Sequence, residues 1–426
     1  MTDKEQILAW MTQYSLGRKS FAEIFTPFEL IEEMLDTLPD EVWSNPDLLW
    51  LDPCAGYGNF YACVIPRLMH GLESSIKDKK TRLKHILTRM LVAVEIQDFS
   101  VSLIQKLWPG MRVLKQSFLD PMPEKFDVIL GNPPYEELLQ AKRKAKNSNL
   151  WSKFTQVALD RLNTSGYLLF ITPPAWMSVS SKLLPQFLAR QLLVLNVGEC
   201  SRHFNVGSKF SYYLIRNNPA NNQTTHITYT FKGGSKIKAY SESNVQVQLA
   251  GLPFLPELLS PTSISLIRKM LKTTPTLVVL NDSHLHKYTK AALLQTTNAP
   301  THPYKVHHTP QQTLWSSHPH PRQTSAKVMI SLTSYFESLV VDDCGTTQGM
   351  SYIECNSLKD AEKLKEQLLL KPYRFFANIT RWSNFNVPDV MKLLPAPPKQ
   401  TKTSQDLYTY FGFNKAEIKL IDDLLA

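Results

Sequence analysis

The chain of 426 residues is poor in cysteine, with five residues scattered along it and no Cys-x-x-Cys pair. An odd number of dispersed cysteines argues against a disulfide framework and against a zinc ribbon. No run of about 18 apolar residues occurs, and the charged start MTDKEQILAWMTQ lacks the apolar core of a signal peptide. We therefore expect a cytoplasmic protein with reduced thiols and no membrane partner.

Glycine is also scarce, at 15 residues, whereas hydrophobic residues make up 43% and aromatic residues 10% of the chain. This composition is typical of a folded globular protein rather than of a disordered one. A chain of this length is expected to form two or three compact units.

Positive charge exceeds negative charge, and the excess is uneven. The formal net charge is +10; residues 1–216 carry 25 Lys and Arg against 22 Asp and Glu, and the remainder carries 22 against 15, which gives +3 and +7. A basic excess concentrated in one half favours a polyanionic partner held mainly by that half. An ordinary basic surface would explain the same count.

Short apolar runs alternate with amphipathic stretches between about residues 48 and 215, which predicts an α/β fold with a mostly parallel sheet. The first four predicted strands end near polar residues, among them Asp52, Glu95 and Asn132. Open α/β sheets bind ligands at the carboxyl ends of their strands. The predicted strands are 48–52, 90–96, 112–116, 126–132, 165–173, 192–200 and 210–217.

The pattern changes beyond Asn217, where a polar linker leads into shorter strands and loops. We therefore predict two domains, residues 1–217 and 218–426. Seven of the 11 histidines fall between His284 and His320, within a stretch rich in Pro, Thr and Gln. Their spacings match no standard metal-ligand set, so we predict a polar loop near a partner rather than a metal site.

The strongest chemical signal is GNPPYEE, which follows the apolar run FDVIL directly. The side-chain oxygen of Asn132 and the carbonyl of Pro133 can accept both hydrogens of a planar amino group. Pro134 biases Pro133 towards an extended conformation, and the ring of Tyr135 can stack on a flat base or amide. A proline-rich turn after a buried strand is the alternative interpretation.

A second signal is LLWLDPCAGYGNF, in which Gly56 and Gly58 follow a strand that ends at Asp52. Glycines at this place let the backbone approach a ligand closely. Glu95 ends the next strand and is suited to the two hydroxyls of a ribose. Together they indicate a nucleotide-like cofactor, although each also occurs in plain strand-to-helix turns and on solvated surfaces.

In this order the motifs resemble those of the N6-adenine DNA methyltransferases of restriction-modification systems, over about residues 21–217. The resemblance is to the subgroup in which cofactor motifs come first, Asn-Pro-Pro-Tyr follows and a target-recognition domain ends the chain. It implies a Rossmann-like class I methyltransferase sheet with helices on both faces and a mixed α+β domain after it. It also implies S-adenosylmethionine as cofactor, double-stranded DNA as partner and base flipping.

The resemblance carries roles onto individual residues. Catalytic roles are implied for Asn132, Pro133, Pro134 and Tyr135, and for Phe204, which would pack on the flipped adenine; Phe210 is an alternative to Phe204. Roles beside the cofactor are implied for Thr26, Pro27, Asp52, Pro53, Ala55, Gly56, Gly58, Glu95, Ser117, Phe118 and Asn132.

One position departs from the family pattern. The family has an acid followed by Phe where this chain has Ser117 and Phe118. Either Ser117 makes a weaker bond to the adenine amine of the cofactor, or Asp120 replaces the missing acid. The sequence leaves this contact open.

Polar and basic residues outside the motifs are candidates for contacts with DNA. Phosphates could be held by Lys142, Arg143, Lys144 and Lys146, although a solvated helix face is equally consistent with them. Candidates for reading base edges are Gln311, Arg322, Arg381 and Asn384.

The predicted function is site-specific adenine N6-methylation of DNA, in restriction-modification or in protective methylation. The sequence leaves open a paired restriction endonuclease and the oligomeric state, for which a monomer is one option. Alternatives are a protein glutamine methyltransferase, a cytosine N4 or RNA methyltransferase, and a DNA-binding protein without activity. The Thr-Pro segment, the aromatic segment near Phe204 and the long basic second half favour DNA.

Overall fold

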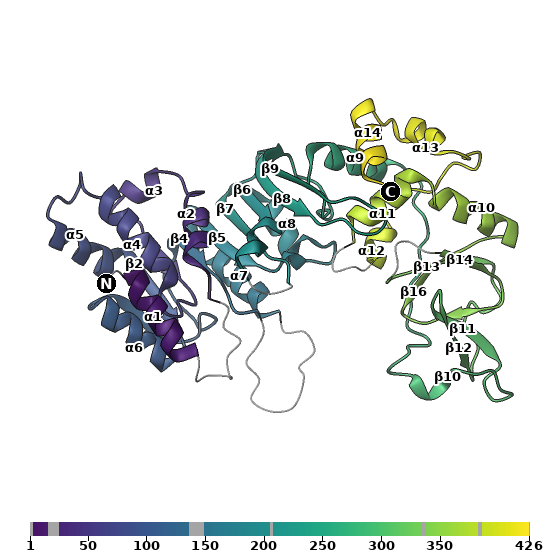
Figure 1. Ribbon diagram of the computed structural model, residues 1–426, viewed down its shortest axis with the longest axis horizontal. Helices are drawn as coiled ribbons and strands as arrows, with labels where there is room; N and C mark the ends of the chain where they lie inside the picture. Colours follow the sequence, from purple (N-terminus) through teal and green to yellow (C-terminus); the bar gives the residue numbers. More distant parts are fainter. Residues whose placement is uncertain are drawn as a thin grey trace. The chain divides into compact units, whose positions relative to one another are not determined.

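The computed structural model describes residues 3–15, 25–135, 149–204, 208–333, 338–381 and 386–425. The chain forms two compact units (Figure 1). Unit 1 comprises Met1–Trp176, Ser181–Tyr229 and Ser243–Gly251, and unit 2 comprises Met177–Ser180, Thr230–Glu242 and Leu252–Ala426. Within the described ranges no helix is long and apolar enough to cross a membrane.

A nine-stranded sheet with the order β3-β2-β1-β4-β5-β7-β6-β8-β9 organises unit 1. Strands β1 to β5 run parallel to one another, and β7 lies antiparallel between β5 and β6. The seven predicted strands and the α/β class are confirmed. The bounds are β1 Trp50–Asp52, β2 Leu91–Glu95, β3 Arg112–Lys115, β4 Phe126–Gly131, β5 Leu162–Thr172, β6 Arg190–Val197, β7 Ser211–Pro219, β8 Thr225–Phe231 and β9 Tyr240–Val247.

Helices cover both faces of this sheet, as predicted. From β1 the chain moves outward through β2 to β3, and from β4 it moves the other way to β5 and β6. Right-handed crossovers in opposite directions place their helices on opposite faces. The helices are α1 Asp3–Ser15, α2 Phe28–Leu35, α3 Glu41–Ser44, α4 Asn59–Gly71, α5 Lys79–His85, α6 Asp98–Leu107, α7 Leu150–Asp160 and α8 Leu183–Leu188, with a π-helical turn at Ile86–Met90.

The alternation of side chains along β5 separates two apolar layers. Tyr167, Leu169 and Ile171 belong to one core with the buried faces of α2 and α4. The side chains between them face the other layer, where the ring of Tyr213 on β7 lies 4.7 Å from that of Phe187 on α8. Both faces of the strand are buried, which is typical of a sheet covered on two sides.

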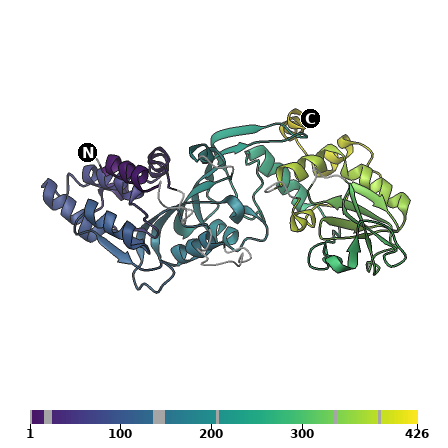
Figure 2. The same cartoon turned by 60° about the horizontal axis from the view of Figure 1, so that its bottom comes forward.

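Unit 2 contains two smaller sheets and a group of helices (Figure 2). One sheet has the order β10-β12-β11-β15 and the other β14-β13-β16. Its strands are β10 Leu294–Gln295, β11 Tyr304–Thr309, β12 Gln312–Ser316, β13 Lys327–Ser331, β14 Ser338–Val341, β15 Gly345–Thr346 and β16 Met350–Glu354. Its helices are α9 Pro261–Lys272, α10 Leu358–Leu368, α11 Lys371–Ile379, α12 Pro388–Met391, α13 Ser404–Phe411 and α14 Lys415–Leu424.

The division between the units lies beyond the predicted boundary at residue 217. Strand β8 continues the large sheet because it pairs in parallel with β6, with His226 opposite Val194. The chain passes from unit 1 into unit 2 at Thr230, returns to unit 1 over Ser243–Gly251 and continues in unit 2 from Leu252. The different roles proposed for the two halves of the chain stay a prediction.

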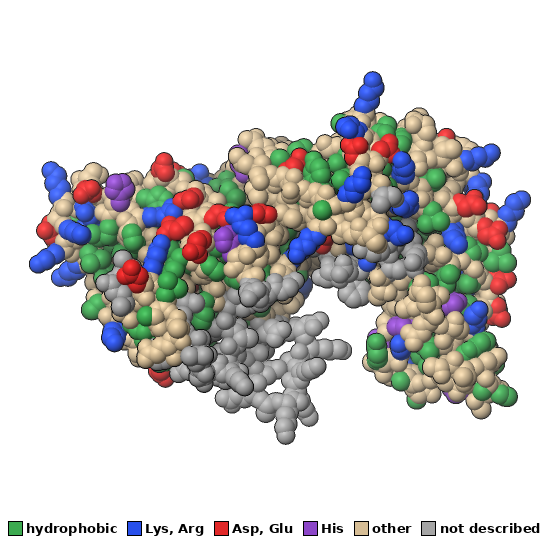
Figure 3. All heavy atoms as spheres, viewed as in Figure 1, with side chains coloured by type: hydrophobic (Ala, Val, Ile, Leu, Met, Phe, Trp, Pro, Cys, Tyr) green, Lys and Arg blue, Asp and Glu red, His purple; other side chains and the backbone are tan. Residues whose placement is uncertain are grey.

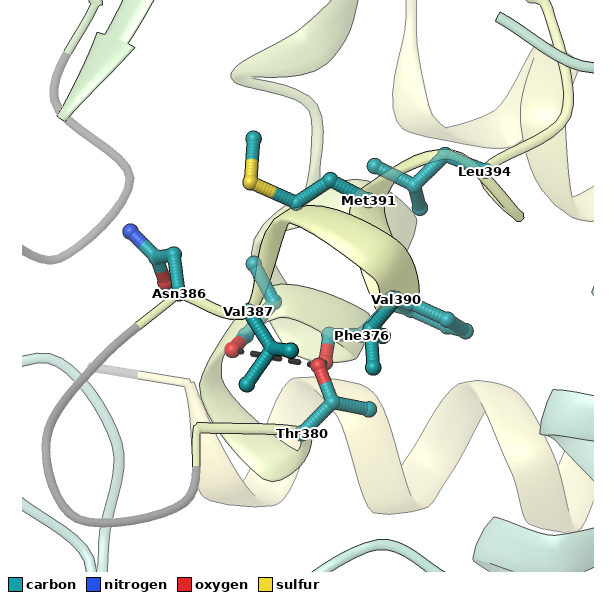
Figure 4. A pocket seen from close by; sticks show the side chains of 8 residues that line it. Phe376, Thr380, Asn386, Val387, Val390, Met391 and Leu394 are labelled. Atoms are coloured by element: carbon teal, nitrogen blue, oxygen red, sulfur yellow. Dashed lines mark hydrogen bonds between the residues drawn. The ribbon is translucent and has the colours of Figure 1, made fainter. Parts of the chain in front are cut away.

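A small hollow between α11 and α12 is lined by Val387, Val390, Met391 and other mostly apolar side chains (Figure 4). Its volume of about 10 Å³ leaves room for little more than one water molecule. The hydroxyl of Thr380 donates to the carbonyl of Phe376 at 2.8 Å. This hollow is a packing defect of unit 2 and is too small for a substrate.

A buried carboxylate joins α14 to α9 in unit 2. Glu417 is 1% exposed. It accepts hydrogen bonds from the hydroxyl of Ser265, from Nζ of Lys269 and from the backbone of Asn414, each at 2.7 Å. We expect Glu417→Ala to lower the free energy of unfolding by about 2–4 kcal/mol, because Lys269 and Ser265 lose a buried partner.

Urea denaturation measures this change, and Asp423→Ala on the same helix is the control. The carboxylate of Asp423 pairs with Lys419 at 2.9 Å, with both side chains more than half exposed. Loss of an exposed pair costs less than about 1 kcal/mol. If both substitutions lowered the free energy of unfolding equally, the stabilising role assigned to Glu417 would be wrong.

Candidate functional site

The predicted cofactor and catalytic motifs meet at the carboxyl edge of the parallel strands. Asp52 ends β1, Glu95 ends β2, Ser117 follows β3 and Asn132 follows β4. The strand order reverses between β1 and β4, and such a reversal opens a crevice for ligands. Side chains from distant parts of the sequence therefore share one site.

The loop after β1 folds over Glu95. One carboxylate oxygen accepts the backbone N–H of Gly56 at 2.9 Å, and the other accepts that of Gln97 at 2.9 Å. A carboxylate has about four lone-pair positions, so these bonds orient Glu95 and leave capacity for the hydroxyls of a ribose. Gly56 and Glu95, which the sequence assigned separately to a cofactor site, are joined by this hydrogen bond.

Two glycines of the site have conformations that other residues resist. Gly58 has a φ of +88°, and a Cβ atom there would lie 2.5 Å from the ring of Trp108. Gly131 has a φ of +152°, and its Cβ would lie 3.0 Å from Oδ1 of Asp52. Gly56 also has a positive φ, of +53°, but a Cβ atom there would meet only the ring of Phe25, at 4.0 Å. The backbone at Gly56 is therefore open to close approach by a ligand.

The amide of Asn132 is held from several sides. Its Nδ2 donates to Oγ1 of Thr26 at 3.1 Å, and its Oδ1 accepts the hydroxyl of Tyr135 at 2.7 Å. Its backbone carbonyl accepts the thiol of Cys54 at 3.2 Å. Thr26 thereby fixes the amide orientation, with the nitrogen towards the Thr-Pro segment and the oxygen towards Tyr135. Pro133 is buried and Pro134 is exposed.

Three aromatic rings continue from Asn132. The ring of Tyr135 lies 5.6 Å from that of Phe210, and the ring of Phe210 lies 4.5 Å from that of Phe204. Phe210 is 1% exposed and Phe204 is 8% exposed. Phe210 therefore packs inside the core and contacts both other rings. Phe204 lies at the other end of the row and is buried in the same core, so its predicted catalytic role stays a prediction.

A carboxylate on α2 positions the segment before Phe204. Glu33 accepts hydrogen bonds from the hydroxyl of Tyr212 at 3.0 Å and from Nδ2 of Asn196 at 3.3 Å. Its second oxygen lies 3.4 Å from Nε2 of His203. Helix α2, which begins directly after Thr26 and Pro27, thus supports both the amide and the aromatic row.

The loop after β3 places Ser117 and Asp120 in one tight turn. The carboxylate of Asp120 accepts the backbone N–H of Ser117 at 3.1 Å, and the hydroxyl of Ser117 accepts the N–H of Leu119 at 3.1 Å. Phe118 is 1% exposed, with its ring 5.4 Å from that of Phe154. Its ring therefore packs in the core, and its predicted role beside the cofactor stays untested.

Sequence reasoning missed Ile96, which follows Glu95 directly. This side chain is 55% exposed, among the most exposed large apolar side chains of the described residues. An apolar residue just after a strand-end acid is the signal that could have identified it. A flat base next to Glu95 would cover this surface.

Other predicted residues lie elsewhere. The basic residues Lys142, Arg143, Lys144 and Lys146, and also Asn384, are outside the described residues. In unit 2, Arg322 lies 3.4 Å from the carboxylate of Glu354, and Arg381 is buried. Gln311 is exposed after β11. Among the described residues no group of three or more His, Cys, Asp or Glu is arranged to hold a metal ion.

Burial shifts the pKa values of three side chains in the site, Asp52, Tyr135 and Cys54. The pKa of Asp52 is raised to about 7. Burial raises it most, the N–H of Cys54 lowers it, and the charge of Glu95 raises it. Burial also raises the pKa of the Tyr135 hydroxyl far above its ordinary value, so this group stays protonated and keeps donating to Asn132. The thiol of Cys54 is likewise held protonated.

The sheet order, the glycine loop facing Glu95 and the Asn-Pro-Pro-Tyr edge together define a class I S-adenosylmethionine-dependent methyltransferase fold. Residues 72–197 match the family model described as the Eco57I restriction-modification methylase. The predicted resemblance to restriction-modification methyltransferases is confirmed by this match.

Two protein relatives agree with that match. An "uncharacterized adenine-specific methylase" of Mycoplasma pneumoniae is 44% identical over 87 residues, which are 20% of this chain and 21% of the relative. The type II methyltransferase M.VspI of a Vibrio species is 25% identical over 190 residues, or 40% of this chain and 42% of the relative. The matched segments thus span less than half of either relative.

Two solved structures share the fold over most of the chain. The DrdV–DNA complex matches 92% of this chain and 57% of its own, with a TM-score of 0.55 and 12% identity. A nuclease-deletion mutant of the type ISP restriction-modification enzyme LlaGI, in complex with a DNA substrate mimic, matches 99% and 56%, with a TM-score of 0.54 and 15% identity. The likeness in fold therefore extends beyond unit 1.

The raised pKa of Asp52 predicts a pH-dependent stability. An unfolded Asp titrates near pH 4 and the folded one near pH 7, so the folded state binds more protons between these values. The contribution of Asp52 to the free energy of unfolding therefore falls as pH rises through this window. Asp52→Asn, which keeps an oxygen for Cys54, should gain stability relative to the parent by up to about 4 kcal/mol at pH 7.

Chemical denaturation at several pH values from 4 to 8 measures this difference. The gain should grow across the window and level off above pH 7. The exposed residue Asp47 supplies the control substitution Asp47→Asn. A difference between Asp52→Asn and the parent that is the same at every pH would contradict the prediction.

Proposed function

We propose that this protein transfers the methyl group of S-adenosylmethionine to the N6 amine of adenine in double-stranded DNA. The observation that carries the proposal is the fixed amide of Asn132, whose oxygen points to Tyr135 while its nitrogen is committed to Thr26. An amide oriented in this way offers an acceptor to an amino group lying against the tyrosine ring. The adenine-specific methylase relative supports adenine as the target.

The residues at the strand edge fit the cofactor. Glu95 would accept from the ribose hydroxyls, Ile96 would contact the adenine ring, and the backbone at Gly56 leaves the space that the nucleoside needs. Glu95 supplies negative charge, which suits a positively charged sulfonium compound, and such a cation would favour ionisation of the neighbouring Asp52. Two residues are candidates for the contact with the adenine amine of the cofactor, Ser117 and Asp120. Their shared turn places both within one loop.

The bound cofactor supplies an electrophilic methyl group, and the chain supplies orientation and charge stabilisation. The lone pair of the target amine is delocalised into the ring, so the amine is a poor nucleophile. Asn132 and the carbonyl of Pro133 would accept its two hydrogens and stabilise the positive charge that develops on nitrogen. To do so, Oδ1 of Asn132 exchanges the hydroxyl of Tyr135 for the substrate.

A base within a duplex cannot present its amine to this edge, so the proposal includes base flipping. Rotation of a nucleotide out of the stack costs a few kcal/mol. Stacking on Tyr135 and Phe204 would recover that cost, since each stacked base contributes about 1–3 kcal/mol. Phe210 packs between these two rings in the structure. When a base is bound, its ring would either move aside or lie beneath the base.

Unit 2 is proposed to recognise the DNA sequence, because the cofactor and catalytic motifs described above lie in unit 1 while the larger basic excess lies after residue 216. Restriction-modification or protective methylation is the proposed setting, in line with the family match. A partner nuclease would fit that setting.

The catalytic role of Asn132 is tested by Asn132→Ala. We expect at least a hundredfold loss of N6-methyladenine formation on duplex DNA with labelled cofactor, because a preorganised charge-stabilising group is worth about 10²–10³ in rate. Cofactor affinity, measured by calorimetry, should change little.

Tyr135→Phe keeps the ring and frees Oδ1 of Asn132, so it should retain most activity. Turnover of Asn132→Ala within tenfold of the parent would refute this role. Methylation of glutamine in a protein, with none on DNA, would refute the proposed substrate.

The stacking role of Phe204 is tested on two substrates. Phe204→Ala should reduce methylation of paired adenine more than methylation of adenine opposite a mismatch, because a mismatched base costs less to extrude. Single-turnover rates on the two duplexes measure the ratio. Phe210→Ala, a core substitution, should lower both rates together. Equal losses on both duplexes for Phe204→Ala would show that Phe204 serves only packing.

A further inference from the structure

Unit 2 carries a cluster of His, Lys and Tyr side chains that belongs to none of the motifs above. The cluster consists of His286, Lys287, Tyr288, Lys290 and His308. The first four lie on the loop before β10, and the last lies on β11. In the sequence no Asp or Glu occurs between Asp282 and Glu337, although this stretch holds seven histidines.

The loop that carries the cluster is held in place at several points. Asp282 accepts hydrogen bonds from the backbone of His284 at 3.1 Å and from the hydroxyl of Tyr352 at 2.9 Å, and its Oδ1 lies 3.2 Å from Nε2 of His320. Leu285 is 3% exposed. The backbone N–H of Lys287 donates to Oε1 of Gln348 at 2.9 Å. The cluster is therefore presented by a fixed loop.

An exposed aromatic ring lies at the centre of the cluster. Tyr288 is 70% exposed. The rings of His286 and His308 lie 6.0 Å and 6.5 Å from its ring, and Nζ of Lys287 lies 5.7 Å from its centroid. A ring this exposed contributes little to the core, so its position among cations needs another explanation.

The positive charges of the cluster have neutral partners. Nζ of Lys287 donates to the side-chain oxygen of Gln312 at 3.0 Å, and Nζ of Lys290 donates to the carbonyl of His284 at 2.9 Å. Nδ1 of His308 lies 2.6 Å from Oγ1 of Thr347. Within the described residues, neither lysine pairs with a carboxylate. The nearest acid along the sequence, Asp282, is engaged by His320 and Tyr352.

The charges of the cluster favour the neutral form of His308, which can still donate a hydrogen bond to an anion. Burial lowers the pKa of His308, and the charges of Lys287 and His286 lower it further. Like charges held close together without an acid create a positive potential that a bound anion relieves. On the face in Figure 3, His and Lys or Arg side chains lie together on the part of unit 2 that carries the small sheets.

We propose that this cluster is a DNA-binding surface of unit 2, at which Lys287, Lys290 and the histidines hold backbone phosphates and Tyr288 contacts a sugar or base. The inference rests on the proposed function. A row of phosphates is the anion that matches several adjacent cations, and an exposed tyrosine among them is typical of nucleic-acid contacts. Phosphate contacts fix position without reading sequence.

The test uses the full chain and a fluorescent duplex of about 20 base pairs in an anisotropy titration at several salt concentrations. We expect Lys287→Glu to weaken binding about tenfold or more at 0.1 M salt. The slope of log affinity against log salt should become shallower by about 1 for each phosphate that the variant no longer neutralises. Tyr288→Ala should weaken binding severalfold and leave that slope unchanged, because it removes no charge.

The matched control is Lys363→Glu, which makes the same charge change at an exposed position of α10. In Figure 1, α10 lies apart from β11 and β12 within unit 2. A control that weakens binding as much as Lys287→Glu would mean that only net charge matters, which overturns the proposal. Thermal unfolding of each variant confirms that affinity is compared between folded proteins.

Adenine methylation, measured in parallel, separates this inference from the proposed function. The parent could methylate duplex DNA while Lys287→Glu and Tyr288→Ala bind it with the affinity of the parent. In that case the proposed DNA-binding surface is wrong and the proposed function holds. If the parent binds duplex DNA through this surface without methylating adenine, the surface stands and the function is wrong. If the parent binds no duplex, both are wrong.

Discussion

The hydrogen bonds around Asn132 are the interaction on which the site depends. An amide side chain can present either its nitrogen or its oxygen, and only the oxygen can accept from an amine. Thr26 accepts from the nitrogen, which leaves the oxygen towards Tyr135. These residues come from segments that meet only because the Thr-Pro turn before α2 lies against the end of β4. Loss of the Thr26 hydroxyl would free the amide to rotate.

Parallel pairing of β1 with β4 makes this meeting possible. Gly131 lies so close to Asp52 that a Cβ would be 3.0 Å from its carboxylate. The same closeness buries Asp52 and raises its pKa to about 7. The site therefore keeps a carboxyl group that is costly to ionise next to the reacting edge, and the fold accepts a loss of stability there. Unit 2 shows the opposite arrangement at Glu417, where three donors surround a buried carboxylate.

The two units use charge differently. In unit 1 the described carboxylates Asp52 and Glu95 lie at the strand edge, where a cationic cofactor would be held. In unit 2 the cluster around Tyr288 has cations with neutral partners, which suits a polyanion. A methyltransferase that acts on DNA needs both, because its two ligands carry opposite charges. Two of the histidines at positions 284–320, His286 and His308, thereby gain a role as a proposal.

The sequence by itself determined the strands and the edge at which they end. Apolar runs of strand length, each followed by a polar or glycine residue, suffice to place Asp52, Glu95 and Asn132 together, because parallel strands share their carboxyl edge. The resemblance in those motifs supplied the chemistry. Only the tertiary structure decided which way the amide of Asn132 faces, that Phe210 packs between Tyr135 and Phe204, and that Ile96 is exposed. It also decided where the compact units divide, through the pairing of β8 with β6. These properties arise from contacts between residues far apart in the chain, which neither spacing nor periodicity records.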